Sequence, residues 1–562
     1  MAVSGESFVQ ALSALPLQQL LLGIVILSSV AVLVRLQLPR ADWYRRLSDR
    51  LLFGVPWGTL VVTAGLLAVY YGLQGGYLDP DEPVVLGFRA WSYFDPSGIV
   101  LASFSHASHS HLIGNVIGTL VFGSLAEYVW SHHVERQTDS PWRTLWTDPV
   151  MRAVGIFPAA VVVVGIVGAA VALGPIIGFS TVVFAFAGFT LIRYPLTTVI
   201  ASVSTGVIST LLTTLRVPQQ VAIAETTYST PWFASIAVQG HAVGLLLGVV
   251  IGLGLLWHRE QSPPPVGRLW VGVLLFSMSR SLWAVYWYRG NEVYVLYRAV
   301  GIALVFVLVT LVTYATVASN RPLFPSRAVP NPQTIRSGLN SITSREVGLA
   351  LLLCGAAIVV GPAIGANLTT AAEADLPGDP IEIRGYEVTY GEDVPDGQLS
   401  AIDIEAFGET TQLNTSGVIV RNTDRQLWAT AVSAGRLANS GEQTVRLGGI
   451  GWRETVTVTR TGWSAVGGES TYTVSLSHGD EQRQVFTADP ARAEPIVAGT
   501  NISIAPVDEE FVILLDEDVA ADPVAIPDHN ESVTVGEVTF VTQDDRLFAV
   551  HNETVVRIAE RE

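Results

Sequence analysis

Two residues in apolar surroundings have the types that nucleophilic catalysis needs, a serine and a histidine. Ser180 follows Gly178 by two positions, and His241 lies at the start of a later apolar run. A serine hydroxyl is a weak nucleophile unless a neighbouring base takes its proton, and imidazole does this near neutral pH. The alternatives are a serine that caps a helix and a histidine that has a partner inside a helical bundle. The spacing along the chain does not by itself decide between these interpretations.

A histidine-rich stretch supplies further polar groups. His111 and Asn115 are four residues apart, so a helix places them on one face, and His106 precedes that helix. The alternatives are interfacial polar residues and a metal site made by His106, His109 and His111. The metal site lacks a carboxylate or cysteine that would complete a tetrahedron.

Small residues follow His241 at helical spacing. Gly244 and Gly248 form a small-xxx-small seam on the face that also carries His241, and such seams let two helices approach closely. The segment that begins near Ser180 has small residues of its own, among them Ala185 and Gly188. We therefore expect these two segments to pack against each other, with Ser180 and His241 at the same end.

The composition indicates a membrane protein. The 562 residues are 49% hydrophobic and 14% charged, whereas soluble domains have about 25% charged residues. The mean hydropathy is +0.43. A membrane-spanning helix needs about 20 apolar residues. Ten segments meet this requirement approximately: 15–36, 54–74, 108–130, 151–174, 178–195, 196–215, 237–257, 267–288, 297–318 and 347–369.

Arginine placement predicts the orientation of these segments. Arginines concentrate in the loops 37–53, 131–150, 258–266 and 319–346, which lie on one side if all ten segments span. The positive-inside rule makes that side cytoplasmic and places both termini outside. The first apolar segment has no basic residues before it, so a retained helix fits better than a cleaved signal peptide.

The part of the chain after residue 370 differs in kind. It has 34 Asp and Glu against 12 Arg, and the whole chain has no lysine. Such acidity argues against nucleic acid as a partner, because phosphate binding needs basic patches. Alternation of polar and apolar residues at 455–459, 471–476 and 537–541 predicts β-strands. Sequons at or beyond the last apolar segment make N-glycans possible on an exported face; they begin at Asn367, Asn414, Asn501, Asn530 and Asn552.

The predicted fold is an all-α polytopic membrane protein with a C-terminal β-rich extracytoplasmic domain. We expect four parts: a leading transmembrane helix with a cytoplasmic loop (1–53), a six-helix core (54–260), three further transmembrane helices (261–370) and the acidic β-rich domain (371–562). The single cysteine, Cys354, excludes an intrachain disulfide and a CxxC motif.

The ordered set of motifs over residues 54–260 resembles the rhomboid family of intramembrane serine proteases. The family patterns HxxxxHxxxN, GxS and HxxGxxxG correspond to His106…His111…Asn115, Gly178-Phe179-Ser180 and His241…Gly244…Gly248. The resemblance implies that Ser180 is the nucleophile, that His241 is its general base, and that His111, Asn115 and the Ser180 backbone N–H form the oxyanion hole. It implies supporting roles for His106, Gly178, Phe184, Gly244 and Gly248, and it matches Gly123 and Glu127 to a GxxxE element. It further implies membrane-protein substrates within the lipid bilayer and no metal or organic cofactor.

Two departures from the family pattern leave alternatives open. Thr181 stands where the family usually has a glycine after the nucleophilic serine. Ser92 stands where the family commonly has an arginine after a tryptophan of the first outer loop, here Trp91. A catalytically inactive rhomboid-like adaptor or quality-control protein is therefore one alternative. A transporter is another, but the paired inverted repeats expected of one are not evident. The acidic, lysine-free C-terminal part resembles salt-adapted, haloarchaeal proteins.

Overall fold

The computed structural model describes residues 17–37, 40–134, 145–220, 228–321, 342–368, 376–398, 405–406, 409–410, 412–507, 510–515 and 523–562. The chain divides into two compact units. The first comprises 1–226, 232–286 and 296–368, and the second comprises 227–231, 287–295 and 369–562. Much of the arginine-bearing loops 131–150 and 319–346, on which the predicted orientation depends, lies outside the described residues.

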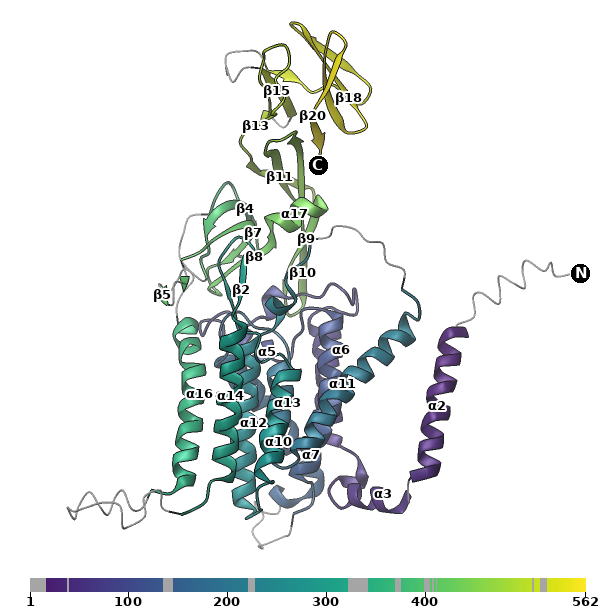
Figure 1. Cartoon of the computed structure of the whole chain (residues 1–562), viewed down its shortest axis with the longest axis vertical. Helices are drawn as coiled ribbons and strands as arrows, with labels where there is room; N and C mark the ends of the chain where they lie inside the picture. Colours follow the sequence, from purple (N-terminus) through teal and green to yellow (C-terminus); the bar gives the residue numbers. More distant parts are fainter. Residues whose placement is uncertain are drawn as a thin grey trace, which may run out of the picture. The chain divides into compact units, whose positions relative to one another are not determined.

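The first unit is α-helical (Figure 1), and all but a few of its helices are apolar. Its α-helices are α2 (Leu17–Gln37), α3 (Arg40–Ser48), α4 (Trp57–Ala68), α5 (Pro96–Ala102), α6 (His109–Gly118), α7 (Ser124–Trp130), α9 (Phe157–Ala170), α10 (Ser180–Leu191), α11 (Pro195–Arg216), α12 (Val238–His258), α13 (Val266–Ser279), α14 (Arg298–Val317) and α16 (Ser344–Leu368). Short 3₁₀ or π segments adjoin several of these: η1 (Leu52–Gly54), η2 (Val69–Leu73), η3 (Leu86–Phe88), η4 (Thr119–Gly123), η5 (Met151–Ile156) and η6 (Trp232–Ser235).

Ten apolar helices match the ten predicted segments in position. Among the described residues, seven are long and apolar enough to cross a membrane, and three are shorter, at Trp57–Leu73, Ser180–Leu191 and Val266–Ser279. The prediction that segments of about 20 residues run over 178–195 and 267–288 was wrong in length. The chain reaches Ser180 through Gly178 at φ 124°, and α13 ends where Ser281 adopts φ 55°, so regular helix is excluded at those positions.

Helices α10 and α12 pack in close contact because glycines leave room for the opposing backbone. A Cβ atom at Gly244 would overlap the carbonyl oxygen of Thr181, and one at Gly248 would overlap that of Ala185. From the other side, a Cβ atom at Gly188 would overlap the carbonyl oxygen of Leu245. The small-residue seam predicted from the sequence therefore brings the backbones of these two helices together.

A buried carboxylate fixes the start of α4. Glu127 accepts hydrogen bonds from the backbone N–H groups of Gly58 and Thr59 at 2.7 and 2.8 Å, and from the Thr59 hydroxyl. A negative charge is favourable at a helix N-terminus. His132 Nδ1 accepts the N–H of Leu52, so its Nε2–H donates to Glu127 at 2.6 Å. Glu127, the glutamate that matches the GxxxE element, therefore has a structural role at the start of α4.

The second unit is β-rich. Its sheets have the orders β12-β11-β10-β20-β19-β18-β17 with β9 on β10, β13-β14-β15-β16, β3-β4-β7-β8, and β5-β6. The strands are β3 (Ile381–Ile383), β4 (Tyr386–Pro395), β5 (Glu405–Ala406), β6 (Glu409–Thr410), β7 (Asn414–Asn422), β8 (Leu427–Ser433), β9 (Glu442–Gly449), β10 (Trp452–Ala465), β11 (Ser470–His478), β12 (Glu481–Thr487), β13 (Ala491–Arg492), β14 (Ile502–Val507), β15 (Glu510–Leu515), β16 (Val524–Ala525), β17 (Ser532–Val535), β18 (Val538–Gln543), β19 (Arg546–His551) and β20 (Thr554–Arg561). A short helix, α17 (Ala434–Ser440), follows β8, and the hairpin β1 (Tyr286–Tyr288) and β2 (Tyr294–Leu296) lies between α13 and α14. The predicted β-rich region is confirmed.

One predicted glycan position does not suit modification in this structure. Asn367 lies in α16 and is 6% exposed, and its amide nitrogen donates to the carbonyl oxygens of Ala170 and Ala172 at 3.3 and 3.1 Å. A glycan attached to that nitrogen replaces one of its two hydrogens, so at least one of these hydrogen bonds would be lost, and the sugar would have to fit into a buried site. The prediction of an N-glycan at Asn367 is therefore corrected, because the amide is part of the helical packing.

Candidate active site

Ser180 is the first residue of α10 and is half-buried. The chain enters the helix through Gly178, whose backbone N–H donates to the carbonyl of Ala102 at 2.9 Å. A Cβ atom at Gly178 would lie 2.5 Å from Cε1 of His111, so only glycine lets that imidazole approach the backbone. Backbone N–H groups in the first turn of a helix have no partner within it. Ser180 therefore combines a hydroxyl with a nearby source of backbone donors.

His241 lies directly beside Ser180. Its Nε2 is 2.9 Å from Ser180 Oγ, which is a hydrogen-bond distance. The ring of Phe184, one turn after Ser180, stacks on the imidazole with centroids 4.2 Å apart and planes 9° apart. Nδ1 of His241 is buried and has no hydrogen-bond partner among the residues that the structure describes. A neutral imidazole with its proton on Nδ1 can accept the serine proton at Nε2.

His111 and Asn115 lie on one face of α6, as the spacing indicated. Asn115 is 6% exposed, and its amide nitrogen donates to the carbonyl oxygen of His111 at 3.2 Å. The Ser108 hydroxyl caps the helix by accepting the N–H of His111 at 3.2 Å. The His111 imidazole reaches Gly178, two residues before Ser180. The structure thus brings His111 to the same end of α10 as Ser180, with Asn115 one turn further along its helix.

His106 supports the site from outside α6. Its ring lies 5.2 Å from that of His111 at 78°, and both of its ring nitrogens are buried without a described hydrogen-bond partner. Gln74 holds the backbone of His106 by accepting its N–H and donating to its carbonyl, both at 2.8 Å. Burial and the neighbouring His111 lower the pKa of His106 to about 3. The ring therefore stays neutral.

The three histidines of this stretch do not converge. His109 faces the hydroxyl of Tyr71 at 3.1 Å, whereas His106 faces His111. Within the described part of the chain, no three His, Cys, Asp or Glu residues are placed to hold a metal ion. The arrangement suits hydrogen bonding and packing around Ser180.

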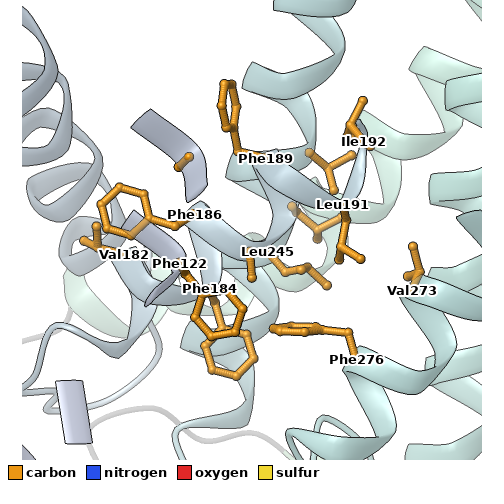
Figure 2. Packing of buried hydrophobic residues seen from close by; sticks show 14 of the residues in the cluster. Phe122, Val182, Phe184, Phe186, Phe189, Leu191, Ile192, Leu245, Val273 and Phe276 are labelled. Atoms are coloured by element: carbon orange, nitrogen blue, oxygen red, sulfur yellow. The ribbon is translucent and has the colours of Figure 1, made fainter. Parts of the chain in front are cut away.

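The motifs gave no indication of the contacts made by two residues at the end of α13, Phe276 and Arg280. Phe276 lies with its ring centroid 5.6 Å from that of Phe184, and Figure 2 shows it among the labelled core residues. Arg280, which directly follows α13, donates to the hydroxyl and carbonyl of Ser202 in α11, each at 2.8 Å. No motif connects α13 to α10, so spacing along the chain offered no signal for these contacts.

The fold and the site define a polytopic helical membrane protein with a serine and a histidine paired between two tightly packed helices. Residues 93–258 match the family model described as Rhomboid domain, so this part of the chain is a rhomboid domain. No curated protein and no solved structure gives a match to this chain. Ser180 and His241 both lie within the matched residues, whereas α13, α14, α16 and the strands β1–β20 follow them.

Proposed function

We propose that this protein is an intramembrane serine endopeptidase that cleaves membrane proteins in or near their transmembrane segments. The observation that carries the proposal is the 2.9 Å distance between Ser180 Oγ and His241 Nε2 inside a rhomboid domain. A hydroxyl and an imidazole at that distance are the two groups that acyl transfer requires. We assign Ser180 as nucleophile and His241 as general base.

The reaction begins when Ser180 Oγ attacks the scissile carbonyl carbon while its proton moves to Nε2 of His241. The carbonyl oxygen becomes an oxyanion, for which the Ser180 N–H, His111 and Asn115 supply donors. When the C–N bond breaks, His241 returns the proton to the leaving amine and an ester to Ser180 remains. A water molecule then attacks the ester, gives a proton to His241, and releases the new carboxyl group as Ser180 regains its hydrogen. Two residues suffice for these proton transfers.

Helical substrates must unwind locally before this attack. The hydrogen bonds of a helix shield its peptide groups, so substrates with helix-breaking or small residues near the cleaved bond are expected. We propose α11 and the residues 216–240 that precede His241 as the entry for substrates; residues 221–227 lie outside the described part of the chain.

The proposed topology places the β-rich unit on the extracytoplasmic side, in agreement with the arginine distribution. Of the sequon asparagines beyond the helices, Asn414, Asn530 and Asn552 are exposed and Asn501 is half-buried, so these four remain the candidates for N-glycans. The lysine-free acidic surface favours a high-salt environment.

The test is cleavage of a fluorescent model transmembrane substrate by the full chain in nanodiscs. The wild type is expected to cleave it, and Ser180→Ala and His241→Ala to lose at least about 10³-fold in rate. Ser110→Ala removes an exposed serine at the start of α6 and should retain activity. A serine-directed fluorophosphonate should label the wild type but not Ser180→Ala. Cleavage that survives Ser180→Ala rules out the assignment, and a wild type that neither cleaves nor becomes labelled supports an inactive adaptor.

A further inference from the structure

Three phenylalanine rings form a continuous series of contacts that starts at the candidate base, His241. We call this series the aromatic column; it consists of Phe184, Phe276 and Phe122, and Phe276 lies outside the rhomboid domain. His241 stacks on Phe184, with ring centroids 4.2 Å apart. Phe184 meets the edge of Phe276 at 5.6 Å and 73°, and Phe276 meets Phe122 at 5.9 Å and 86°. Figure 2 shows Phe276 reaching from its helix toward the other two phenylalanines. Of these four rings, the one from α13 is outside the residues that match the family model.

The rings of this column are buried and packed against one another. Phe276 is 1% exposed and Phe122 is also 1% exposed. Edge-to-face contacts are a favoured arrangement of aromatic rings. Because Phe276 is buried and in edge contact with Phe184, it limits the positions that the ring of Phe184 can take.

Two contacts fix α13 along α11. Near its middle, a Cβ atom at Gly272 would lie 2.6 Å from Cβ of Pro195, so glycine permits the close approach. At its end, Arg280 donates to the Ser202 hydroxyl and carbonyl at 2.8 Å and also to the Thr205 hydroxyl. Phe276 lies one helical turn before Arg280, so these contacts set the depth at which its ring meets Phe184.

We propose that Phe276 is a positioning residue for His241, acting through Phe184. This inference rests on the proposed function. A histidine base is commonly oriented by a hydrogen bond to its second nitrogen, but Nδ1 of His241 has no partner among the described residues. The orientation of the ring therefore depends on the surfaces that pack against its face. Helix α13 is in this sense a part of the active site, although it follows the rhomboid domain in the chain.

The test is a double-mutant cycle measured on the full chain in nanodiscs. Phe184→Leu and Phe276→Leu are each expected to lower kcat about 10- to 100-fold with little change in KM, because a small displacement of the base slows proton transfer. The double variant should be no slower than the slower single variant, since both changes release the same ring. Leu352→Ala, a fully buried position in α16, is the control for general loss of packing and should keep the wild-type kcat.

An independent measurement follows the imidazole itself. The side-chain NMR signals of His241, assigned by their loss in His241→Ala, should move in Phe276→Leu but not in Leu352→Ala, because the rotated Phe184 ring changes the local ring current. Losses of kcat that multiply in the double variant, or signals of His241 that are the same in Phe276→Leu as in the wild type, overturn the proposal. An inactive wild type refutes the proposed function alone, and the NMR comparison then still decides whether Phe276 orients His241.

Discussion

At the scale of single residues, the threonine that follows Ser180 is accommodated by glycines around it. Thr181 is 3% exposed. A Cβ atom at Gly168 in α9 would lie 2.7 Å from its methyl group, and one at Gly240 would lie 3.4 Å from its hydroxyl oxygen. The carbonyl of Thr181 meets Gly244 in α12. The neighbouring helices thus leave space for Thr181 where the family pattern has a glycine. Ser180, the residue before it, keeps its hydrogen-bond distance to His241.

Gly168→Ala should destabilise the protein by about 1–3 kcal/mol, because the added methyl group overlaps that of Thr181 in a packed interior. Thr181→Ser removes the opposing methyl and should restore most of the loss when the two changes are combined. Thermal unfolding of the two single variants and the double variant measures this coupling. Gly155→Ala, where the nearest atom is the end of the flexible Met151 side chain at 3.5 Å, serves as control. Equal unfolding temperatures for Gly168→Ala and Gly155→Ala contradict the packing argument.

The neutral, buried His106 predicts a loss of stability in acid. Its folded-state pKa of about 3 lies below the ordinary value of 6.5, so the unfolded chain binds more protons between these values. The free energy of unfolding then falls as pH drops below 6.5, by about 2 kcal/mol at pH 5 from this group. The groups that face it are His111 and the Tyr70 ring. His106→Gln should show a correspondingly smaller decrease in unfolding temperature between pH 7 and pH 5. An unchanged decrease argues against a neutral His106.

At the scale of elements, α13 is joined to α11 by a charge inside the bundle. Arg280 is half-buried, and three of its hydrogen bonds end on Ser202 and Thr205. A guanidinium that is shielded from water needs such acceptors, because an unpaired buried charge is costly. The hydrogen bonds therefore explain why an arginine is tolerated between two apolar helices.

Ser202→Ala removes one of these acceptors and should lower the free energy of unfolding by about 1–3 kcal/mol. The matched control is Ser209→Ala, an exposed position on the same helix, which should stay within about 0.5 kcal/mol of the wild type. Thermal unfolding in the same detergent compares the two. If both variants behave alike, the hydrogen bonds of Arg280 do not hold α11 to α13.

The sequence predicted those relations that one helix or one motif contains. The glycine seam of Gly244 and Gly248 indicated that α12 would pack against the helix of Ser180, and the i, i+4 spacing placed Asn115 with His111. The start of α10 and the end of α13 could not be predicted from the sequence. Hydropathy gives no information about the positive φ angles of Gly178 and Ser281, which interrupt regular helix there. Phe276 reaches the site from a helix with no spacing relation to Ser180. A contact between two helices that are not linked by a motif depends on how the helices are arranged in space. The hydrophobic periodicity of each helix does not determine that arrangement.

At the scale of the whole molecule, the β-rich unit includes two short segments of the chain that connect transmembrane helices. Residues 227–231 precede α12, and residues 287–295 lie between α13 and α14. Within this unit the hydroxyl of Tyr228 lies 3.0 Å from that of Ser433 and also contacts Glu292. These segments and the strands β7 and β8 line a polar cavity of about 440 Å³.

The charge of residues 371–562 predicts that salt stabilises this unit. Its net charge of about −22 makes the folded state repel itself, and ions screen that repulsion over distances of about 10 Å or less. Raising KCl from 0.1 to 2 M should increase the unfolding temperature of the β-rich unit in the full chain by about 4–8 °C, which corresponds to about 2 kcal/mol. Neutralising four exposed carboxylates near the β17–β19 turns, Glu531, Glu537, Asp544 and Asp545, should raise the temperature at low salt and reduce the dependence on KCl. Differential scanning calorimetry measures both quantities. A variant with the salt dependence of the wild type would show that these charges are already screened or paired.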